Sequence, residues 1–348
     1  MKKFLVLILV LLMALALAGC GGAEKKAAEA TAITDSLGRR IEVQLPLQKV
    51  VVANAYNTEL INAVGAIEAV IGVDYNIYRD QEGYKNRFNK EQVIGSNQRE
   101  LNYEKIIELA PEALILTSNG SWEEAEKKLG AFGIKVITVD AYYTSDFFKN
   151  VKLIGQLFGK EERAAELTSY FKGKLEYIQK QLADVPKKTL YFEYRREGNT
   201  TIPGNYFYHM VEYAGADNIF ADAKNVSVES ESIVLRNPAY IVKVSDSNVG
   251  SSYVPPTKED FAQRRHAIES RPGWDTIDAV KNDHILLLSH FVHGGASKMV
   301  GTMYIAKFLY PEQLPDLHPE EVFQTWLTKY QGLDYIAGHT SPAFNLQE

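Results

Sequence analysis

The stretch Gly159–Pro186, GKEERAAELTSYFKGKLEYIQKQLADVP, decides the fold that the sequence predicts. Gly159 interrupts the preceding pattern, Pro186 stops this one, and Glu161 and Glu162 place negative charge in the first helical turn. Apolar residues recur at helical spacings of three and four; they are Ala164, Leu167, Phe171, Leu175, Ile178 and Leu182. About 24 residues at roughly 1.5 Å each predict a mostly solvated helix about 36 Å long.

Strand and helix signals alternate on both sides of this helix, over roughly 110 residues before it and 130 after it, each near the size of one domain. Strands are predicted at 49–53, 69–73, 113–116, 135–139, 189–194, 240–244 and 284–288. Helices are predicted at 58–64, 103–109, 122–129, 146–158, 206–213, 274–280, 297–309 and 319–330. Such alternation predicts an α/β fold with parallel-rich sheets flanked by helices. We expect an N-terminal lobe at 33–145, a helical connector at 146–186, and a C-terminal lobe at 187–348 with an irregular tail.

The N-terminus has the features of an export signal. Lys2 and Lys3 precede an unbroken apolar run that is too short for a comfortable membrane span. It ends at Cys20, the single cysteine of the chain, in a sequence that resembles the bacterial lipobox. We therefore expect 1–20 to be a lipoprotein signal peptide, Cys20 to be lipidated, and 21–32 to be a flexible tether. The alternative is a plain signal peptide with an incidental cysteine.

Composition and charge narrow the function classes. The chain has 348 residues, 46% hydrophobic and 24% charged, which is ordinary globular composition. Its net charge of −6 becomes −8 when the two lysines of the signal are removed, and an acidic chain argues against nucleic acid as a partner. We expect a monomer that is anchored outside the cytoplasm by its lipid.

The loops that follow the predicted strands are rich in tyrosine and arginine, and in an open parallel sheet these loops form the ligand site. Tyrosine offers a broad face and a hydroxyl group, and arginine pairs with carboxylate or catecholate oxygens, so an anionic metal chelate would suit both. The alternative is that individual tyrosines are packing residues and individual arginines are solvated. The candidates are Tyr56, Tyr78, Arg79, Tyr84, Arg87, Trp122, Tyr142, Tyr143, Arg195, Arg196, Tyr206, Tyr208, Tyr253, His290 and His293.

Direct metal ligation is a separate question. His290 and His293 could ligate a metal or a haem iron, or could form a hydrogen-bonded turn. Tyr56, Tyr78 or Tyr142 could supply a phenolate to ferric iron. The sequence does not favour any one of these alternatives, and we assign no side chain as a metal ligand.

Nine short segments stand in a specific order and spacing: 35–39 (DSLGR), 102–106 (NYEKI), 109–112 (LAPE), 133–136 (GIKV), the helix after Gly159, 214–219 (AGADNI), 237–238 (NP), 271–274 (RPGW) and 279–280 (AV). Together they resemble the substrate-binding lipoproteins of bacterial ABC importers for ferric siderophores, haem and cobalamin. The resemblance covers nearly all of the mature sequence. It implies two lobes joined by one rigid helix, a ligand held between the lobes, no enzymatic activity and a permease dimer as partner.

The resemblance also implies a docking role for Glu104 and Glu231. Each lies at the start of a predicted helix and precedes an apolar run that ends in a proline-containing segment. In the family, glutamates at such positions pair with arginines of the two permease subunits. The alternative is that both acids only stabilise a helix dipole, and Glu229 leaves the choice in the second lobe open.

Two other classes of function are disfavoured. All seven histidines, beginning at His209, follow the long helix, whereas a zinc or manganese site between lobes would draw imidazoles from both. Gly-x-Ser-x-Gly and His-Glu-x-x-His motifs are absent, and 155–160 (GQLFGK) is one residue short of a phosphate loop. We therefore expect a binding protein for a ferric chelate, with haem or cobalamin as the alternative ligand, and no intrinsic cofactor.

Overall fold

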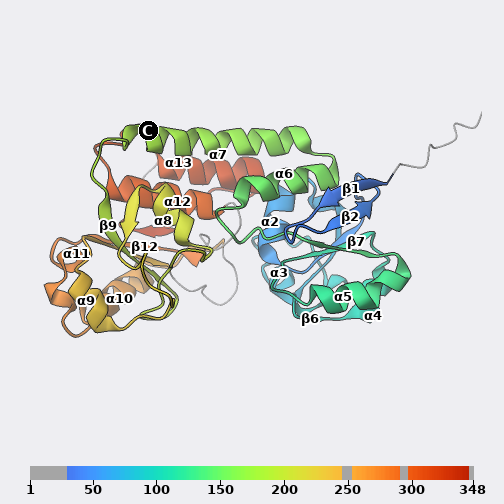
Figure 1. Cartoon of the computed structure of the whole chain (residues 1–348), viewed down its shortest axis with the longest axis horizontal. Helices are drawn as coiled ribbons and strands as arrows, with labels where there is room; N and C mark the ends of the chain where they lie inside the picture. The colour runs from blue at the N-terminus through green and yellow to red at the C-terminus, as the bar shows by residue number, and fades with distance from the viewer. Residues whose placement is uncertain (1–29, 245–252, 291–296, 345–348) are drawn as a thin grey trace, which may run out of the picture.

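A computed structural model describes residues 30–244, 253–290 and 297–344. Two α/β lobes lie on the same side of one long helix, α7 (Glu161–Gln181), which runs across both of them (Figure 1). The predicted signal peptide with Cys20, nearly all of the tether, and His293 lie outside the described residues. None of the helices in the described part has the length and apolar character that a membrane span requires.

The N-terminal lobe contains a four-stranded parallel sheet with the strand order β4-β3-β7-β8. A β1–β2 hairpin (Thr31–Thr34, Arg40–Val43) and a β5–β6 hairpin (Gly95–Asn97, Glu100–Leu101) complete its strands. The sheet strands are β3 (Val50–Val52), β4 (Val70–Val73), β7 (Ala113–Leu116) and β8 (Lys135–Thr138). The helices are α2 (Ala55–Ala63), α3 (Tyr75–Arg79), α4 (Tyr103–Leu109), α5 (Trp122–Leu129) and α6 (Phe147–Phe158).

The C-terminal lobe contains a five-stranded sheet with the order β10-β9-β11-β12-β13, in which only the edge strand β13 is antiparallel. The strands are β9 (Lys188–Tyr194), β10 (Ala216–Asn218), β11 (Tyr240–Val244), β12 (Ile285–Leu288) and β13 (Thr340–Ser341). The helices are α8 (Tyr208–Tyr213), α9 (Ser230–Arg236), α10 (Lys258–Glu269), α11 (Asp278–Lys281), α12 (Ser297–Leu309) and α13 (Pro319–Thr325).

The central strands of the two large sheets, β3, β7, β11 and β12, are buried on both faces, as expected for sheets that helices cover on each side. In β7, Ala113 and Ile115 join the large central core, whereas Leu114 and Leu116 join a smaller core under α4 and α5. In β9, the alternating residues Leu190, Phe192 and Tyr194 belong to the central core. The remaining face of that sheet packs against a third core, which includes Trp274.

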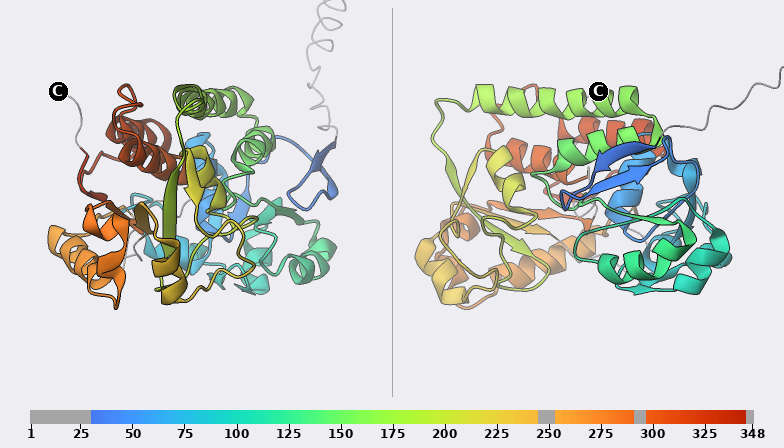
Figure 2. Two further views of the ribbon diagram at one scale, coloured as in Figure 1. Left: turned by 60° about the vertical axis from the view of Figure 1, so that its left-hand side comes forward. Right: turned by 45° about the vertical axis from the view of Figure 1, so that its right-hand side comes forward.

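The central core is continuous between the two lobes. It contains strand residues of both sheets together with side chains from α6, α7, α12 and α13. These four helices lie on the same side of the molecule in every view (Figure 2). The apolar stripe predicted for the long helix is confirmed, because Ala164, Leu167, Phe171 and Ile178 are buried. The helix is thus packed along the core rather than free between the lobes.

The sequence missed or misjudged several elements. The tail after Gly332 is not wholly irregular, since β13 adds an edge strand to the second sheet. The helix predicted at 319–330 divides into α13 and a π-helical turn at Trp326–Gln331. The helix predicted at 274–280 is a 3₁₀ turn at Trp274–Thr276 followed by the short α11. These are short segments in which local pattern is a weak guide.

Candidate functional site

A cleft with a volume of about 750 Å³ lies between the lobes, where the carboxyl ends of the strands face each other. The N-terminal lobe contributes the loops after β3, β4, β7 and β8, and the C-terminal lobe contributes the loops after β9 and β12 and the segment before α8. Its lining residues are Asn54, Ala55, Tyr56, Asp74, Asn76, Arg79, Asp80, Asn97, Gln98, Asn119, Tyr142, Tyr143, Tyr194, Arg195, Gly204, Asn205, Tyr206 and His290.

Helix capping explains why polar side chains stand at two of these strand ends. Asn54 caps α2 by accepting a hydrogen bond from the backbone N–H of Tyr56 at 2.9 Å. Asp74 caps α3 by accepting from the backbone N–H of Asn76 at 2.8 Å and of Ile77 at 3.1 Å. A short helix that begins directly after a strand needs such a cap, so each cap is placed at the mouth of the sheet.

One wall of the cleft, in the N-terminal lobe, is built from side-chain amides. Gln98 is at the centre of this wall: its Nε2 donates to Oδ1 of Asn119 at 2.7 Å, and its Oε1 accepts from Oγ1 of Thr117 at 2.5 Å. Nδ2 of Asn54 also donates to Oε1 of Gln98, at 3.4 Å. These bonds fix the orientation of the amides, which leaves an ordered polar surface for a ligand with hydrogen-bonding groups.

A second wall of the cleft is aromatic, and its residues come from both lobes. The ring of Tyr142 lies 6.4 Å from that of Tyr56 and 6.1 Å from that of Tyr206, in an edge-to-face arrangement in the second case. Tyr194 meets Tyr206 edge to face at 6.0 Å. Burial raises the pKa of Tyr56 to about 12 and raises the pKa values of Tyr142, Tyr194 and Tyr206. At neutral pH these phenols are therefore uncharged hydrogen-bond donors.

Charged groups stand at the rim of the cleft. Arg195 has a left-handed backbone with φ of 56°, and its guanidinium group lies over the ring of Tyr194 at 4.9 Å. Arg79 ends α3 on the facing lobe. Burial raises the pKa of Asp74 to about 6, although two backbone N–H groups and the charge of Arg79 oppose this rise. The cleft therefore carries both cationic and acidic groups.

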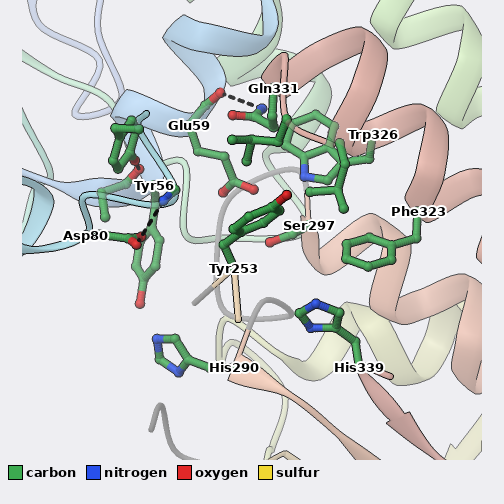
Figure 3. Close-up of a pocket in the computed structure, with 15 residues that line it drawn as sticks. Tyr56, Glu59, Asp80, Tyr253, His290, Ser297, Phe323, Trp326, Gln331 and His339 are labelled. Carbon is green, nitrogen blue, oxygen red and sulfur yellow. Dashed lines mark hydrogen bonds between the residues drawn. The ribbon is translucent and has the colours of Figure 1, made fainter. Parts of the chain in front are cut away.

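A smaller chamber of about 110 Å³ adjoins the cleft and shares Ala55, Tyr56, Asp80 and His290 with it. Figure 3 shows Tyr56 on one side of the chamber, Phe323 and Trp326 on the other, and Tyr253 between them. Its remaining lining residues are Glu59, Gly83, Tyr84, Ser297, Leu327, Gln331, Leu333 and His339.

The structure brings together nine of the predicted binding residues. The cleft is lined by Tyr56, Arg79, Tyr142, Tyr143, Arg195, Tyr206 and His290. The side chamber is lined by Tyr84 and Tyr253, whose hydroxyl groups donate to the carbonyl oxygens of Ala55 at 3.4 Å and Asp334 at 2.7 Å.

Five predicted residues do not line either cavity, and each has other contacts or exposure that explains its place. Tyr78 packs against the central core and the ring of Tyr75, and Arg87 pairs with Glu68 at 2.5 Å. Trp122 begins α5 with the guanidinium group of Arg39 over its ring at 4.4 Å. Arg196 is exposed in the turn beside Arg195, and Tyr208 begins α8 with its ring 6.0 Å from that of His209.

Other lining residues were not predicted. Asp74 and Tyr194 stand at strand ends, so the position of the strands gave a signal for both. Gln98 belongs to the β5–β6 hairpin and Asn205 to an irregular segment, and neither segment has a pattern from which a ligand site could be predicted. Within the described residues, no group of three or more His, Cys, Asp and Glu side chains is arranged to hold a metal ion.

The predicted docking glutamates occupy matching places in the two lobes. Glu104 and Glu231 are each the second residue of a seven-residue helix, α4 and α9, and both are exposed. Each helix ends in a left-handed residue, Ala110 with φ of 47° and Asn237 with φ of 42°. Both helices lie on the side of the molecule opposite α7 (Figure 1).

Comparisons with known proteins give the family. The family model described as periplasmic binding protein matches residues 50–290. YvrC, an ABC transporter substrate-binding lipoprotein of Bacillus subtilis, is 27% identical over 85% of this chain and 93% of its own length. The iron-uptake system-binding protein of the same organism is 25% identical over 83% of this chain and 92% of its own length. Other relatives are named as molybdate-binding and vitamin B12-binding proteins.

Among solved structures, the chain is similar to the TroA-like periplasmic binding protein FepB of Veillonella parvula. The TM-score is 0.72 at 21% identity, and the match covers 90% of this chain and 99% of the other. This likeness confirms the two-lobed fold. Together with the match over residues 50–290 and with relatives that serve ABC transporters, it leads to one conclusion: this chain belongs to the periplasmic binding protein family and is an ABC transporter substrate-binding protein.

Proposed function

We propose that the protein captures a ferric chelate of the siderophore type in the cleft between its lobes and delivers it to an ABC transporter permease. The observation that carries this proposal is the pairing of an aromatic wall with arginines from both lobes around a cleft of about 750 Å³. That volume is within the usual range of small-molecule sites. Tyrosine faces suit the planar aromatic arms of a chelator, and guanidinium groups suit its anionic oxygens.

The iron-uptake system-binding protein of Bacillus subtilis supports iron as the transported metal. Haem and cobalamin remain the alternative ligands, and the vitamin B12-binding relatives favour the second of these. The ordered amide wall around Gln98 would suit the hydrogen-bonding groups of either a siderophore backbone or a corrin. A lipid-anchored enzyme and a binding protein for bare zinc or manganese receive less support from the cleft, because its lining is dominated by tyrosine and side-chain amides.

Spectroscopy and mass spectrometry of the protein purified from its own producer test this function. Catecholate–iron, haem and corrin absorb at distinct wavelengths, so a co-purified ligand can be assigned to its class. A ferric chelate in the spectrum, with its mass recovered after denaturation, would support the proposal. A corrin or haem spectrum would replace it with the corresponding alternative, and turnover of an ester or phosphate substrate would point to an enzyme.

The proposal includes a lipid anchor at Cys20 and docking through Glu104 and Glu231. YvrC is named as a lipoprotein, which supports the anchor. Acyl chains on Cys20 would supply the membrane affinity, so Cys20→Ser should release the protein from the membrane fraction. Retention of that variant in the membrane would contradict lipidation at this residue while leaving the binding function untouched.

A further inference from the structure

Lys298, in the first turn of α12, is a buried lysine that the proposed function does not use. Only 1% of its surface is exposed. Its Nζ donates a hydrogen bond of 2.7 Å to the carbonyl oxygen of Tyr142. The same nitrogen lies 4.7 Å from the ring centroid of Tyr56, 5.6 Å from that of Tyr206 and 5.5 Å from that of Phe207. The ammonium group is thus enclosed by one carbonyl group and three aromatic rings.

These contacts place Lys298 directly behind the aromatic wall of the cleft. Three of the residues that it contacts, Tyr56, Tyr142 and Tyr206, also line the cleft. They come from both lobes, whereas Lys298 belongs to the C-terminal lobe. A ligand seated on this wall would be separated from the ammonium group by a single layer of side chains. Among buried side chains a charge is screened far less than in water.

The groups in direct contact with the ammonium group favour a cation without neutralising it. Aromatic faces and a carbonyl oxygen attract an ammonium group without carrying a full negative charge. Burial lowers the pKa of Lys298 to about 7, and Glu59 is the acidic group that opposes this change. An anion in the cleft would oppose it further. The titratable groups that face Lys298 from the elements packed against it are Tyr56 and Glu59 of α2, Tyr142 after β8 and Tyr206 before α8.

We propose that Lys298 is a specificity-determining residue of the cleft, whose buried ammonium group supplies a positive charge behind the aromatic wall and favours anionic over uncharged ligands. The inference rests on the proposed function in that it takes the cleft as the ligand site. Beyond the proposed function, the inference states that the ligand is negatively charged and that Lys298 selects for this charge. Burial of a lysine costs stability, so a packing role alone does not account for an ammonium group at this position.

Two variants separate charge from packing. Lys298→Gln keeps an N–H donor for the carbonyl oxygen of Tyr142 and removes the charge. Lys298→Met keeps an aliphatic chain of similar length and removes both the N–H donor and the charge. The probes are two iron(III) complexes of similar size: a hexadentate tris-catecholate, which is anionic, and a hexadentate tris-hydroxamate, which is uncharged. Quenching of intrinsic fluorescence gives the affinity of each complex for the wild-type protein and both variants.

Both variants are expected to bind the anionic complex about tenfold more weakly than wild type, and the uncharged complex about as well. The wild-type advantage over Lys298→Gln should also shrink as the pH rises from about 6 to about 8, because the ammonium group loses its proton in this range. Tyr56, Tyr142 and Tyr206 do not titrate there, since burial raises their pKa values. Taking the ratio of wild type to variant cancels the titration of the ligand and of those groups in the cleft that do not interact with Lys298.

Two results would overturn the inference: equal weakening of both complexes by Lys298→Met with no effect of Lys298→Gln, or an affinity of Lys298→Gln for the anionic complex that equals that of wild type at about pH 6. Failure of the wild-type protein to bind either complex would count against iron chelates as ligands and not against Lys298. In that case the charge is measured in the unliganded protein by urea unfolding. The stability of wild type relative to Lys298→Gln should rise between about pH 6 and pH 9, because the unfolded lysine holds its proton more tightly. A constant difference would be resolved by NMR titration of the Lys298 side chain: an amine that is already neutral at about pH 6 would overturn the inference, and an ammonium group that persists would support it.

Discussion

Nζ of Lys243 donates a hydrogen bond of 2.7 Å to the carbonyl oxygen of Arg195. The same nitrogen pairs with Oε1 of Glu193 at 2.9 Å, and Arg271 binds both oxygens of that carboxylate. Burial alone would raise the pKa of Glu193, but Arg271 and Lys243 together hold it below its usual value. This buried group of charges therefore fixes the strained turn that directs Arg195 toward the cleft.

Lys243→Met should weaken ligand binding although Lys243 does not line the cleft. The variant removes the donor that holds the carbonyl oxygen of Arg195, so the arginine is no longer fixed at the rim. We expect a several-fold loss of affinity in calorimetry, and a free energy of unfolding that falls by about 2 kcal/mol because Arg271 still neutralises Glu193. Lys281→Met, at an exposed lysine of α11, is the control and should change neither quantity. Unchanged affinity in Lys243→Met would show that the turn holds Arg195 without it.

Arg195 and Arg196 form a matched pair for testing the cleft. They are neighbours with the same side chain, but only Arg195 lines the cavity. Loss of a charge-assisted contact to an anionic ligand costs on the order of 2–5 kcal/mol, so Arg195→Ala should weaken binding at least about tenfold. Arg196→Ala should bind like wild type in the same titration. Equal losses in the two variants would indicate a general effect of net charge rather than a contact.

Asp74→Asn should stabilise the protein at neutral pH. Asn can cap α3 as Asp74 does, but it carries no charge into the buried position. A pKa raised to about 6 means that the folded state binds the proton more tightly, so wild type loses stability as the pH rises from about 4 to about 7. Over this range the variant should gain roughly 3 kcal/mol relative to wild type in denaturant unfolding. If the difference in free energy of unfolding between variant and wild type stays constant across this range, burial does not raise the pKa of Asp74.

The double variant Glu104→Ala with Glu231→Ala tests docking. If both glutamates pair with the permease, the variant should abolish uptake in cells, while ligand affinity and melting temperature stay close to those of wild type. Charge pairs at a rim mainly affect association, so raised ionic strength should imitate the defect.

A control for that experiment is Glu161→Ala with Glu176→Ala, which removes two exposed acids from α7 on the opposite side of the molecule. This variant should transport normally, although its net charge changes by the same amount. Normal uptake by the Glu104 and Glu231 double variant would reject the docking proposal and leave the family assignment intact.

Much of the fold could be predicted because many of its helices and strands have a clear local pattern of apolar residues. The bounds of α4, β7, α5, β11 and α12 are those expected from the sequence. The elements that were missed are short or weakly apolar. The strand β10 has three residues, and α10 has only two buried residues in twelve, Phe261 and Ile268. Such segments adopt their structure through tertiary contacts, which a local pattern does not contain.

Only those residues of the candidate site that follow the ends of predicted strands could be predicted from the sequence. The rule that ligands bind beyond the carboxyl ends of parallel strands found Tyr56, Tyr142 and Arg195. It could not separate Arg195 from Arg196, because the direction of each side chain depends on the left-handed turn. Lys298 gave no signal, since it contacts the aromatic wall only through packing between segments that are distant in the sequence.

The central claim is that the cleft holds one anionic iron chelate and releases it unchanged. Calorimetric titration of the purified protein with the hexadentate iron(III) tris-catecholate complex tests it most directly, with the Arg195→Ala variant titrated in parallel. The account predicts one complex per chain, a dissociation constant of about 1 μM or lower, a clear loss of affinity in the variant, and recovery of the intact complex after denaturation. Binding of cobalamin or haem at the same stoichiometry, with no heat from the iron complex, would contradict it.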